Sequence, residues 1–295
     1  MAHSRSSGDL QLVVDRRNGL SARLTDVQAA FSRGFATISR HHKMKVLDLF
    51  SSKEHWDRYW GEEVSSEIHK ELLRQIFCRL DVTGQMILEV GAGGGLDSIA
   101  LAEKGAKVIA LDYSSTAIDK IASNAAAHGV HLCLVIAEAH NLPFANDSFD
   151  LVFHQGLLEH FANPLKLLLE QNRVIKKGRY ILVDVPQTYN LYTIEKRIAM
   201  HRGRWFTGWE REFTIGELES LLKTAGFALD GAYGWGYYPA LFGWLRRTAW
   251  LHRRAQYIPW FRPLVALLDA WWRFVEDTRL PLYYLKSIGV MGRKN

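Results

Sequence analysis

The segment Met86-Ile-Leu-Glu-Val-Gly-Ala-Gly-Gly-Gly95 joins a short apolar run to a turn rich in glycine. A helical pattern follows up to Glu103, so the predicted order is strand, tight turn, helix. Glycines let the backbone turn sharply and let a ligand come close, and the start of the helix adds unpaired N–H groups. The segment therefore predicts a nucleotide site, and enzymes that bind NAD use the same device.

Strands and helices continue to alternate on the carboxyl side of this segment. The apolar runs that we expect to form further strands lie at 107–111, 132–137, 149–154, 179–185, 227–233 and 283–292. Helical patterns separate most of them, including one from Pro164 to Ile175 and one from Thr214 to Ala225. Such alternation predicts an α/β fold with a doubly wound, mostly parallel sheet.

The chain divides into two parts at about residue 50. Residues 1–50 mix apolar and charged side chains at loosely helical spacing, so we expect a helical extension that caps the ligand cleft. The main domain is expected over 51–295, with insertions at about 187–211 and 237–282. The spacing of apolar residues also predicts one helix from Trp56 to Cys78, whereas the first insertion has no regular pattern.

Composition and charge narrow the class of protein. The 295 residues are 48% hydrophobic and 23% charged, which is typical of a globular chain with a core. A formal net charge of +6 is compatible with anionic lipid or nucleic acid as a partner. Cys78 and Cys133 form no CxxC pattern, and the chain has neither an apolar run of about 18 residues nor a signal peptide pattern. We therefore expect a cytoplasmic protein.

Three acidic residues at successive strand ends indicate the kind of nucleotide. Glu89 precedes the first glycine by two residues, where a carboxylate suits an amino-acid ammonium and would be awkward beside a pyrophosphate. Asp112 ends the next strand, where an acid can accept hydrogen bonds from both ribose hydroxyls. Glu138 follows the third strand and leads to Leu142-Pro-Phe144 and then to Asn146-Asp-Ser-Phe-Asp150.

These residues resemble the class I S-adenosylmethionine-dependent methyltransferases, in particular the group with an LPF…SFD signature that methylates quinones, sterols and small molecules. The resemblance covers about Met86 to Val185. It implies a Rossmann-like methyltransferase fold of seven strands with the last one antiparallel, and S-adenosyl-L-methionine as the cofactor.

The resemblance also implies a role for each residue of the cofactor site. The glycine turn would hold the methionine part, Asp112 the ribose, and Glu138 the adenine amino group, where aspartate is commoner in the family. Tyr113 would stack on the adenine or pack beside it. The expected cofactor-binding residues are Glu89, Gly91, Gly93, Gly95, Asp112, Tyr113, Glu138 and Ala139. The structural alternatives are a tight turn at the glycines, a solvated strand end at Glu89 and a helix cap at Asp112.

Two histidines follow the fourth predicted strand, in His154-Gln-Gly-Leu-Leu-Glu-His160. Strand carboxyl ends face the ligand crevice in open α/β sheets, and imidazole titrates close to neutrality. His160 and His154 are therefore candidate catalytic bases, with a role in shaping the pocket as the alternative. Ubiquinone O-methylating enzymes carry Glu-x-x-Glu-His as a magnesium site. Gly156 stands here in place of the first glutamate, so we expect no metal.

Both insertions combine aromatic residues with arginine, and the first also contains Lys196. Such a mixture fits an interfacial helix hairpin, so we expect peripheral membrane contact through 240–279, with a helical lid or a dimer surface as the alternative. Nucleic acid is disfavoured as the acceptor, because the chain has neither an RNA-binding module nor the Asn/Asp-Pro-Pro-Tyr/Phe motif of base-methylating enzymes.

The sequence thus predicts an enzyme that transfers a methyl group from S-adenosylmethionine to an oxygen or carbon of a small, hydrophobic or lipid-like acceptor. Two alternatives stay open. One is a methyltransferase for a sugar or a cell-envelope polysaccharide, in which the aromatic insertion would stack on sugar rings. The other is a catalytically inactive scaffold that binds S-adenosylmethionine.

Overall fold

The computed structural model describes residues 52–62, 67–202, 205, 210–236, 260, 262–267, 270 and 278–295. The predicted extension 1–50 and most of the insertion 237–282 lie outside the described residues. Within the described part of the chain, no helix has the length and apolar character needed to span a membrane.

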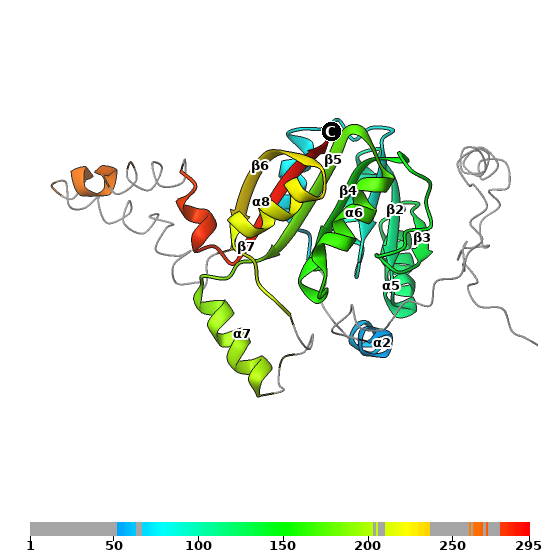
Figure 1. Cartoon of the computed structure of the whole chain (residues 1–295), viewed down its shortest axis with the longest axis horizontal. Helices are drawn as coiled ribbons and strands as arrows, with labels where there is room; N and C mark the ends of the chain where they lie inside the picture. Colours follow the sequence, from blue (N-terminus) through cyan, green and yellow to red (C-terminus); the bar gives the residue numbers. More distant parts are fainter. Residues whose placement is uncertain are drawn as a thin grey trace, which may run out of the picture.

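A seven-stranded sheet forms the centre of the molecule (Figure 1). Its strands are β1 (Met86–Val90), β2 (Lys107–Asp112), β3 (Cys133–Ile136), β4 (Phe149–Gln155), β5 (Ile175–Pro186), β6 (Phe227–Trp235) and β7 (Ser287–Lys294). Their order is β3-β2-β1-β4-β5-β7-β6. Strands β1 to β5 pair in parallel, and β7 runs antiparallel to both of its neighbours. The predicted doubly wound, Rossmann-like sheet is confirmed.

Helices cover both faces of this sheet, because alternate strand residues point to opposite faces. The helices are α2 (Lys53–Gly61), α3 (Lys70–Phe77), α4 (Leu96–Glu103), α5 (Ser115–Ala127), α6 (Pro164–Val174), α7 (Leu191–His201) and α8 (Ile215–Thr224). On one face, Leu88 of β1 belongs to the same apolar cluster as Leu167 of α6 and Leu222 of α8. On the other face, Ile87 belongs to a cluster with Leu72 of α3.

Local signals explain where several helices begin. The Ser114 side chain accepts a hydrogen bond from the amide of Ala117 and so caps α5. Thr214 and Glu217 form a reciprocal capping box at the start of α8. These short-range contacts fix the direction in which the chain leaves the sheet.

Three details of the predicted elements are wrong. The expected helix from Trp56 to Cys78 is two helices, α2 and α3, and Ile68 between them is exposed. Residues 187–211, which show no regular apolar pattern, contain α7, whose first turn is capped by Asn190. The last strand begins at Ser287 rather than at Tyr283, because a short 3-10 helix, η4 (Leu280–Tyr283), precedes it.

Candidate active site

A cavity of about 490 Å³ lies at the carboxyl ends of the central strands. Its size is that of a site for a small molecule or a cofactor. All eight residues predicted to bind the cofactor line it, namely Glu89, Gly91, Gly93, Gly95, Asp112, Tyr113, Glu138 and Ala139. The parallel sheet brings them together because the strand ends of β1, β2 and β3 meet at one edge.

The glycine turn is tied to the neighbouring strand. The amides of Gly91 and Ala92 both donate to the carbonyl of Leu111 in β2, at 2.8 and 3.0 Å. Gly91, Gly93 and Gly95 have positive φ angles, and Gly95 is the N-cap of α4. The turn therefore presents its backbone, and not side chains, to the cavity.

Three carboxylates surround this turn. Glu89 is buried and accepts hydrogen bonds from the amide and the hydroxyl of Ser98, at 3.2 and 2.5 Å. Its burial, and then the negative charge of Asp97, raise the pKa of Glu89 well above its usual range, and Asp112 adds to this effect. Asp97 is bound by the backbone amide and the ring Nδ1 of His69, at 2.8 and 2.5 Å. The site is thus rich in carboxyl groups before any ligand binds.

Asp112 joins the turn to the start of α5. One carboxylate oxygen accepts from the amide of Gly93 and the other from the amide of Ser114, both at 2.9 Å. Burial raises the pKa of Asp112, and these amides oppose that effect. Tyr113 and Glu138 lie near one another at this end. Burial raises the pKa of Tyr113, and the nearby charge of Glu138 raises it further.

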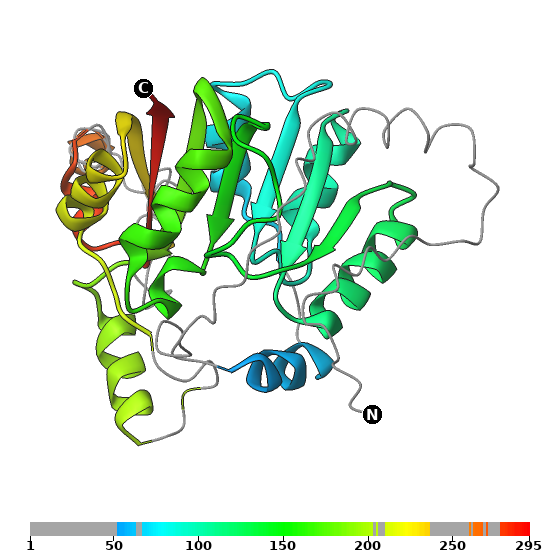
Figure 2. The ribbon, with the colours of Figure 1, turned by 45° about the vertical axis from the view of Figure 1, so that its right-hand side comes forward.

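Helix α2 supplies cavity residues that sequence reasoning did not assign to the site. Trp56, Tyr59 and Trp60 line the cavity. The helix lies across this end of the sheet beside α5 (Figure 2), and Asp57 accepts a hydrogen bond from the Ser114 hydroxyl at 2.6 Å. Their spacing of three and four residues places these aromatic side chains on one face of a helix, and this pattern in the sequence could have indicated that the face lines a site.

The two candidate bases have different surroundings. His160 ends the 3-10 turn η2 (Leu158–His160) and lines the cavity, with its ring edge-on to Trp56 at a centroid distance of 4.9 Å. His154 is fully buried in β4 and is not among the cavity-lining residues. Its burial lowers its pKa to about 3, so it stays neutral at physiological pH. Of the two candidate bases, the structure thus places His160 at the cavity and His154 in the buried part of β4.

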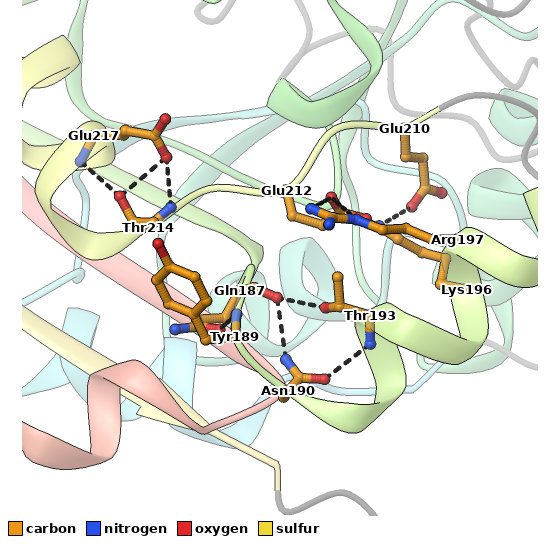
Figure 3. A network of polar contacts seen from close by, with 10 residues as sticks. All are labelled: Gln187, Tyr189, Asn190, Thr193, Lys196, Arg197, Glu210, Glu212, Thr214 and Glu217. Atoms are coloured by element: carbon orange, nitrogen blue, oxygen red, sulfur yellow. Dashed lines mark hydrogen bonds and ion pairs between the residues drawn. The ribbon is translucent and has the colours of Figure 1, made fainter.

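Buried charges lie beside His160. Glu210 lines the cavity, with an oxygen 3.9 Å from His160 Nε2 and the other oxygen 3.0 Å from Lys196 Nζ. Lys196 also lies 3.2 Å from Glu212, and Figure 3 shows it between the two carboxylates. Burial, and then the charge of Glu210, raise the pKa of Glu159 well above its usual range. Sequence reasoning missed Glu210 and Lys196, which come from the first insertion.

Acidic residues outnumber basic ones around the cavity, whereas the chain as a whole has a formal net charge of +6. Seven carboxylic acids line it, namely Glu67, Glu89, Asp97, Asp112, Glu138, Glu159 and Glu210. The bases among its described lining residues are Lys286, His69 and His160. Such a cavity favours a cationic or neutral ligand over a pyrophosphate.

Comparisons with known proteins agree with this fold. A family described as "Methyltransferase domain" matches residues 88–183. A ubiquinone biosynthesis O-methyltransferase of Ruegeria sp. is 26% identical over 189 residues, which are 61% of this chain and 75% of that protein. The corresponding Brucella anthropi enzyme is 29% identical over 168 residues, which are 55% of this chain and 68% of that protein.

Solved structures share the fold at lower identity. A Bacillus halodurans protein assigned as a methyltransferase has a TM-score of 0.54 at 20% identity, covering 76% of this chain and 99% of its own. The [4+2]-cyclase SpnF has a TM-score of 0.51 at 21% identity and covers 92% of both chains. The matched residues, 88–183, include the strands that carry the glycine turn and its acids. Residues 88–183 are therefore a methyltransferase domain of the class I, S-adenosylmethionine-dependent type, and the chain is an enzyme of methyl transfer.

Proposed function

We propose that this enzyme binds S-adenosylmethionine in the cavity and transfers its methyl group to an oxygen or a carbon of a small, hydrophobic or lipid-like acceptor. The residues proposed to hold S-adenosylmethionine are Glu89, Gly91, Gly93, Gly95, Asp112, Tyr113, Glu138 and Ala139. His160 is the proposed proton acceptor. It is needed when the methylated atom carries a proton at neutral pH.

The observation that carries this proposal is the set of carboxylates around the glycine turn. Glu89 is fully enclosed and is raised in pKa by burial and by Asp97, so a cation placed beside it would favour its ionised form. The ammonium of S-adenosylmethionine is such a cation. A pyrophosphate in the same place would meet three acids, which argues against NAD.

The acceptor side of the cavity supports a hydrophobic substrate. Aromatic side chains from separate segments line this part, namely Trp56, Tyr59, Tyr192 and Trp205. The relatives described above are named for ubiquinone biosynthesis, whose end product carries an isoprenoid chain, and this likeness supports a lipid-like acceptor. In-line transfer needs the acceptor to be oriented and water to be excluded, which these walls can do.

Two further parts of the proposal concern the segments around the cavity. Residues 1–50 lead into α2 and are proposed to extend its cover over the cleft. Residues 240–279 are proposed to contact a membrane peripherally. Within that range Trp260, Leu264 and Leu267 are exposed, which supports contact with an apolar phase.

Radiolabelled methyl transfer from S-adenosylmethionine tests the proposal, with a lipid extract and a polar metabolite extract as parallel acceptors. Label is expected in the lipid extract. For a hydroxyl acceptor, His160→Gln should lower the rate by about 100-fold or more, the usual contribution of a general base. His154→Gln is the matched control and should keep the rate per folded molecule.

The other outcomes separate the alternatives. Label confined to the polar extract would contradict a lipid-like acceptor and favour a sugar. The absence of label from both extracts would contradict catalysis and favour a scaffold that binds S-adenosylmethionine.

A further inference from the structure

We infer that Glu210 is a positioning residue for His160. Lys196 holds the Glu210 carboxylate where it stabilises the imidazolium that forms when His160 takes the acceptor proton. This inference rests on the proposed function, since it concerns methylation of a hydroxyl. It assigns a role to residues 187–212, which the sequence pattern left without one.

The three side chains form a buried chain of contacts that begins at α7 and ends in the cavity. The exposed fractions are 1% for Lys196, 8% for Glu210 and 4% for His160. One Glu210 oxygen lies 3.0 Å from Lys196 Nζ, and the other lies 3.9 Å from His160 Nε2. The carboxylate is thus fixed by one oxygen and directed at the histidine with the other.

Lys196 is itself held on a second side. Its Nζ lies 3.2 Å from Glu212, and Glu212 lies 2.9 Å from Arg197, the next residue of α7 (Figure 3). The lysine therefore keeps a carboxylate partner even when Glu210 loses its charge. The arrangement favours an ionised Glu210, because an ammonium within hydrogen-bonding distance stabilises the anion.

The chemistry of the step explains why a carboxylate is useful here. The acceptor oxygen forms a bond to the methyl carbon, the bond from that carbon to sulfur breaks, and the hydroxyl proton moves to the imidazole ring of His160, whose Nε2 faces Glu210. The sulfonium loses its positive charge and the imidazole gains one. A carboxylate 3.9 Å from that nitrogen stabilises the new charge inside a closed site, where an uncompensated charge would be costly.

Three other described side chains near His160 are less suited to supply this charge. Glu159, in the same turn, has a pKa raised well above its usual range by burial and by Glu210, which disfavours its charged form. Tyr59 of α2 has a raised pKa because of burial and the charge of Glu210, so it is neutral as well. Trp56 contributes an aromatic edge only. Glu210 is therefore the anion that we assign to His160.

Histidine NMR on the full chain with S-adenosylhomocysteine bound tests the inference. The ring resonances of His160 are followed against pH in the wild type, Glu210→Gln and Glu212→Gln, and His160→Gln identifies them among the 12 histidines. Removing a carboxylate at this distance should lower the titration midpoint of His160 by at least about one pH unit in Glu210→Gln. Glu212→Gln also removes a partner of Lys196 and should leave the midpoint within about 0.3 units, since the Glu212 carboxylate pairs with Lys196 and Arg197.

Equal midpoints in the wild type and Glu210→Gln would overturn the inference. If Glu210→Gln does not fold, Glu210→Asp replaces it: its shorter side chain withdraws the carboxylate and should give a smaller drop, and an unchanged midpoint would again contradict the role. Calorimetry with S-adenosylhomocysteine on the same samples separates the two proposals. A wild type that gives no heat would contradict the proposed function, whereas binding with unchanged midpoints would contradict the role of Glu210 alone.

Discussion

At Gly93 the backbone has a φ of +52°, and a Cβ there would lie 2.4 Å from the indole of Trp60. The same residue donates its amide to Asp112. Gly93 therefore joins the proposed ribose-binding acid, the glycine turn and the cover formed by α2. A side chain at this position would disturb all three.

Gly93→Ala is expected to weaken binding of S-adenosylhomocysteine by at least about tenfold, because Trp60 or the turn must shift. The wild type should bind S-adenosylhomocysteine in a calorimeter and give no heat with NAD. Gly129→Ala is the matched control, since Gly129 also has a positive φ of +67° but its Cβ would meet nothing within 4 Å. Both variants lose about 1 kcal/mol of stability from the left-handed backbone, whereas only the first should lose affinity. Wild-type affinity in Gly93→Ala would refute this account.

Single residues of the site differ in how far the sequence could predict them. Glu89, Asp112 and Glu138 follow strands, and the carboxyl ends of parallel strands meet at one edge, so their convergence on the cavity was predictable. Glu210 is fifty positions from His160 in a stretch, Trp209-Glu-Arg-Glu212, whose alternating charges do not show which acid turns inward. That choice depends on Lys196, a contact that exists only in the folded chain.

Helix α7 carries two neighbouring cations that share Glu212 as a partner but differ in burial. Lys196 is buried between Glu210 and Glu212, whereas Arg197 contacts Glu212 from the exposed side of the helix. A buried ion that loses its partner costs far more than a surface pair. The helix should therefore depend on the lysine and tolerate loss of the arginine.

Lys196→Met is expected to lower the free energy of unfolding by about 3 to 5 kcal/mol, because it leaves two carboxylates in a closed space. Arg197→Met should lower it by less than about 1 kcal/mol, since the arginine is exposed and Glu212 keeps Lys196 as a partner. Urea denaturation of both variants measures the difference. Similar losses in the two proteins would show that Lys196 is not buried between these acids.

The same helix shows why the spacing of apolar residues did not predict a helix in this segment. Leu191, Ile194 and Ile198 are 48%, 55% and 47% exposed, whereas Thr193 and Lys196 are buried. The helix thus turns polar groups inward and apolar groups outward, which inverts the pattern used to predict helices from sequence. The sheet strands bury their apolar residues in the usual way, so most of their limits were predicted to within a few residues.

At the scale of the whole molecule, Asp184 links the parallel and antiparallel parts of the sheet. It is fully buried in β5, and Trp235 at the end of β6 donates its indole N–H to the carboxylate at 2.8 Å. Burial raises the pKa of Asp184 from 3.8 to about 7, and this effect exceeds the opposing one of its hydrogen bonds. The folded protein therefore holds a proton on Asp184 that the unfolded chain has already released between pH 4 and 7.

This proton makes the stability of the wild type fall as pH rises through that window. Relative to Asp184→Asn, the free energy of unfolding of the wild type should fall by about 1.4 kcal/mol per pH unit between about pH 4 and about pH 7, and then level off. Urea titrations at several pH values give this difference. Asp230→Asn, at an exposed position of β6, is the control and should show no such slope. A difference between Asp184→Asn and the wild type that does not change with pH would contradict a proton on Asp184.

Strand β7 lies between β5 and β6 in the sheet, although it follows both of them along the chain. During translation, β5 and β6 must therefore leave the ribosome with unpaired backbone N–H and C=O groups on the edges that β7 will later pair with. The sheet can close only after residue 294 has been synthesised and the late strand has entered the gap. Nascent chains stalled before that point would be exposed to aggregation and would benefit from a chaperone.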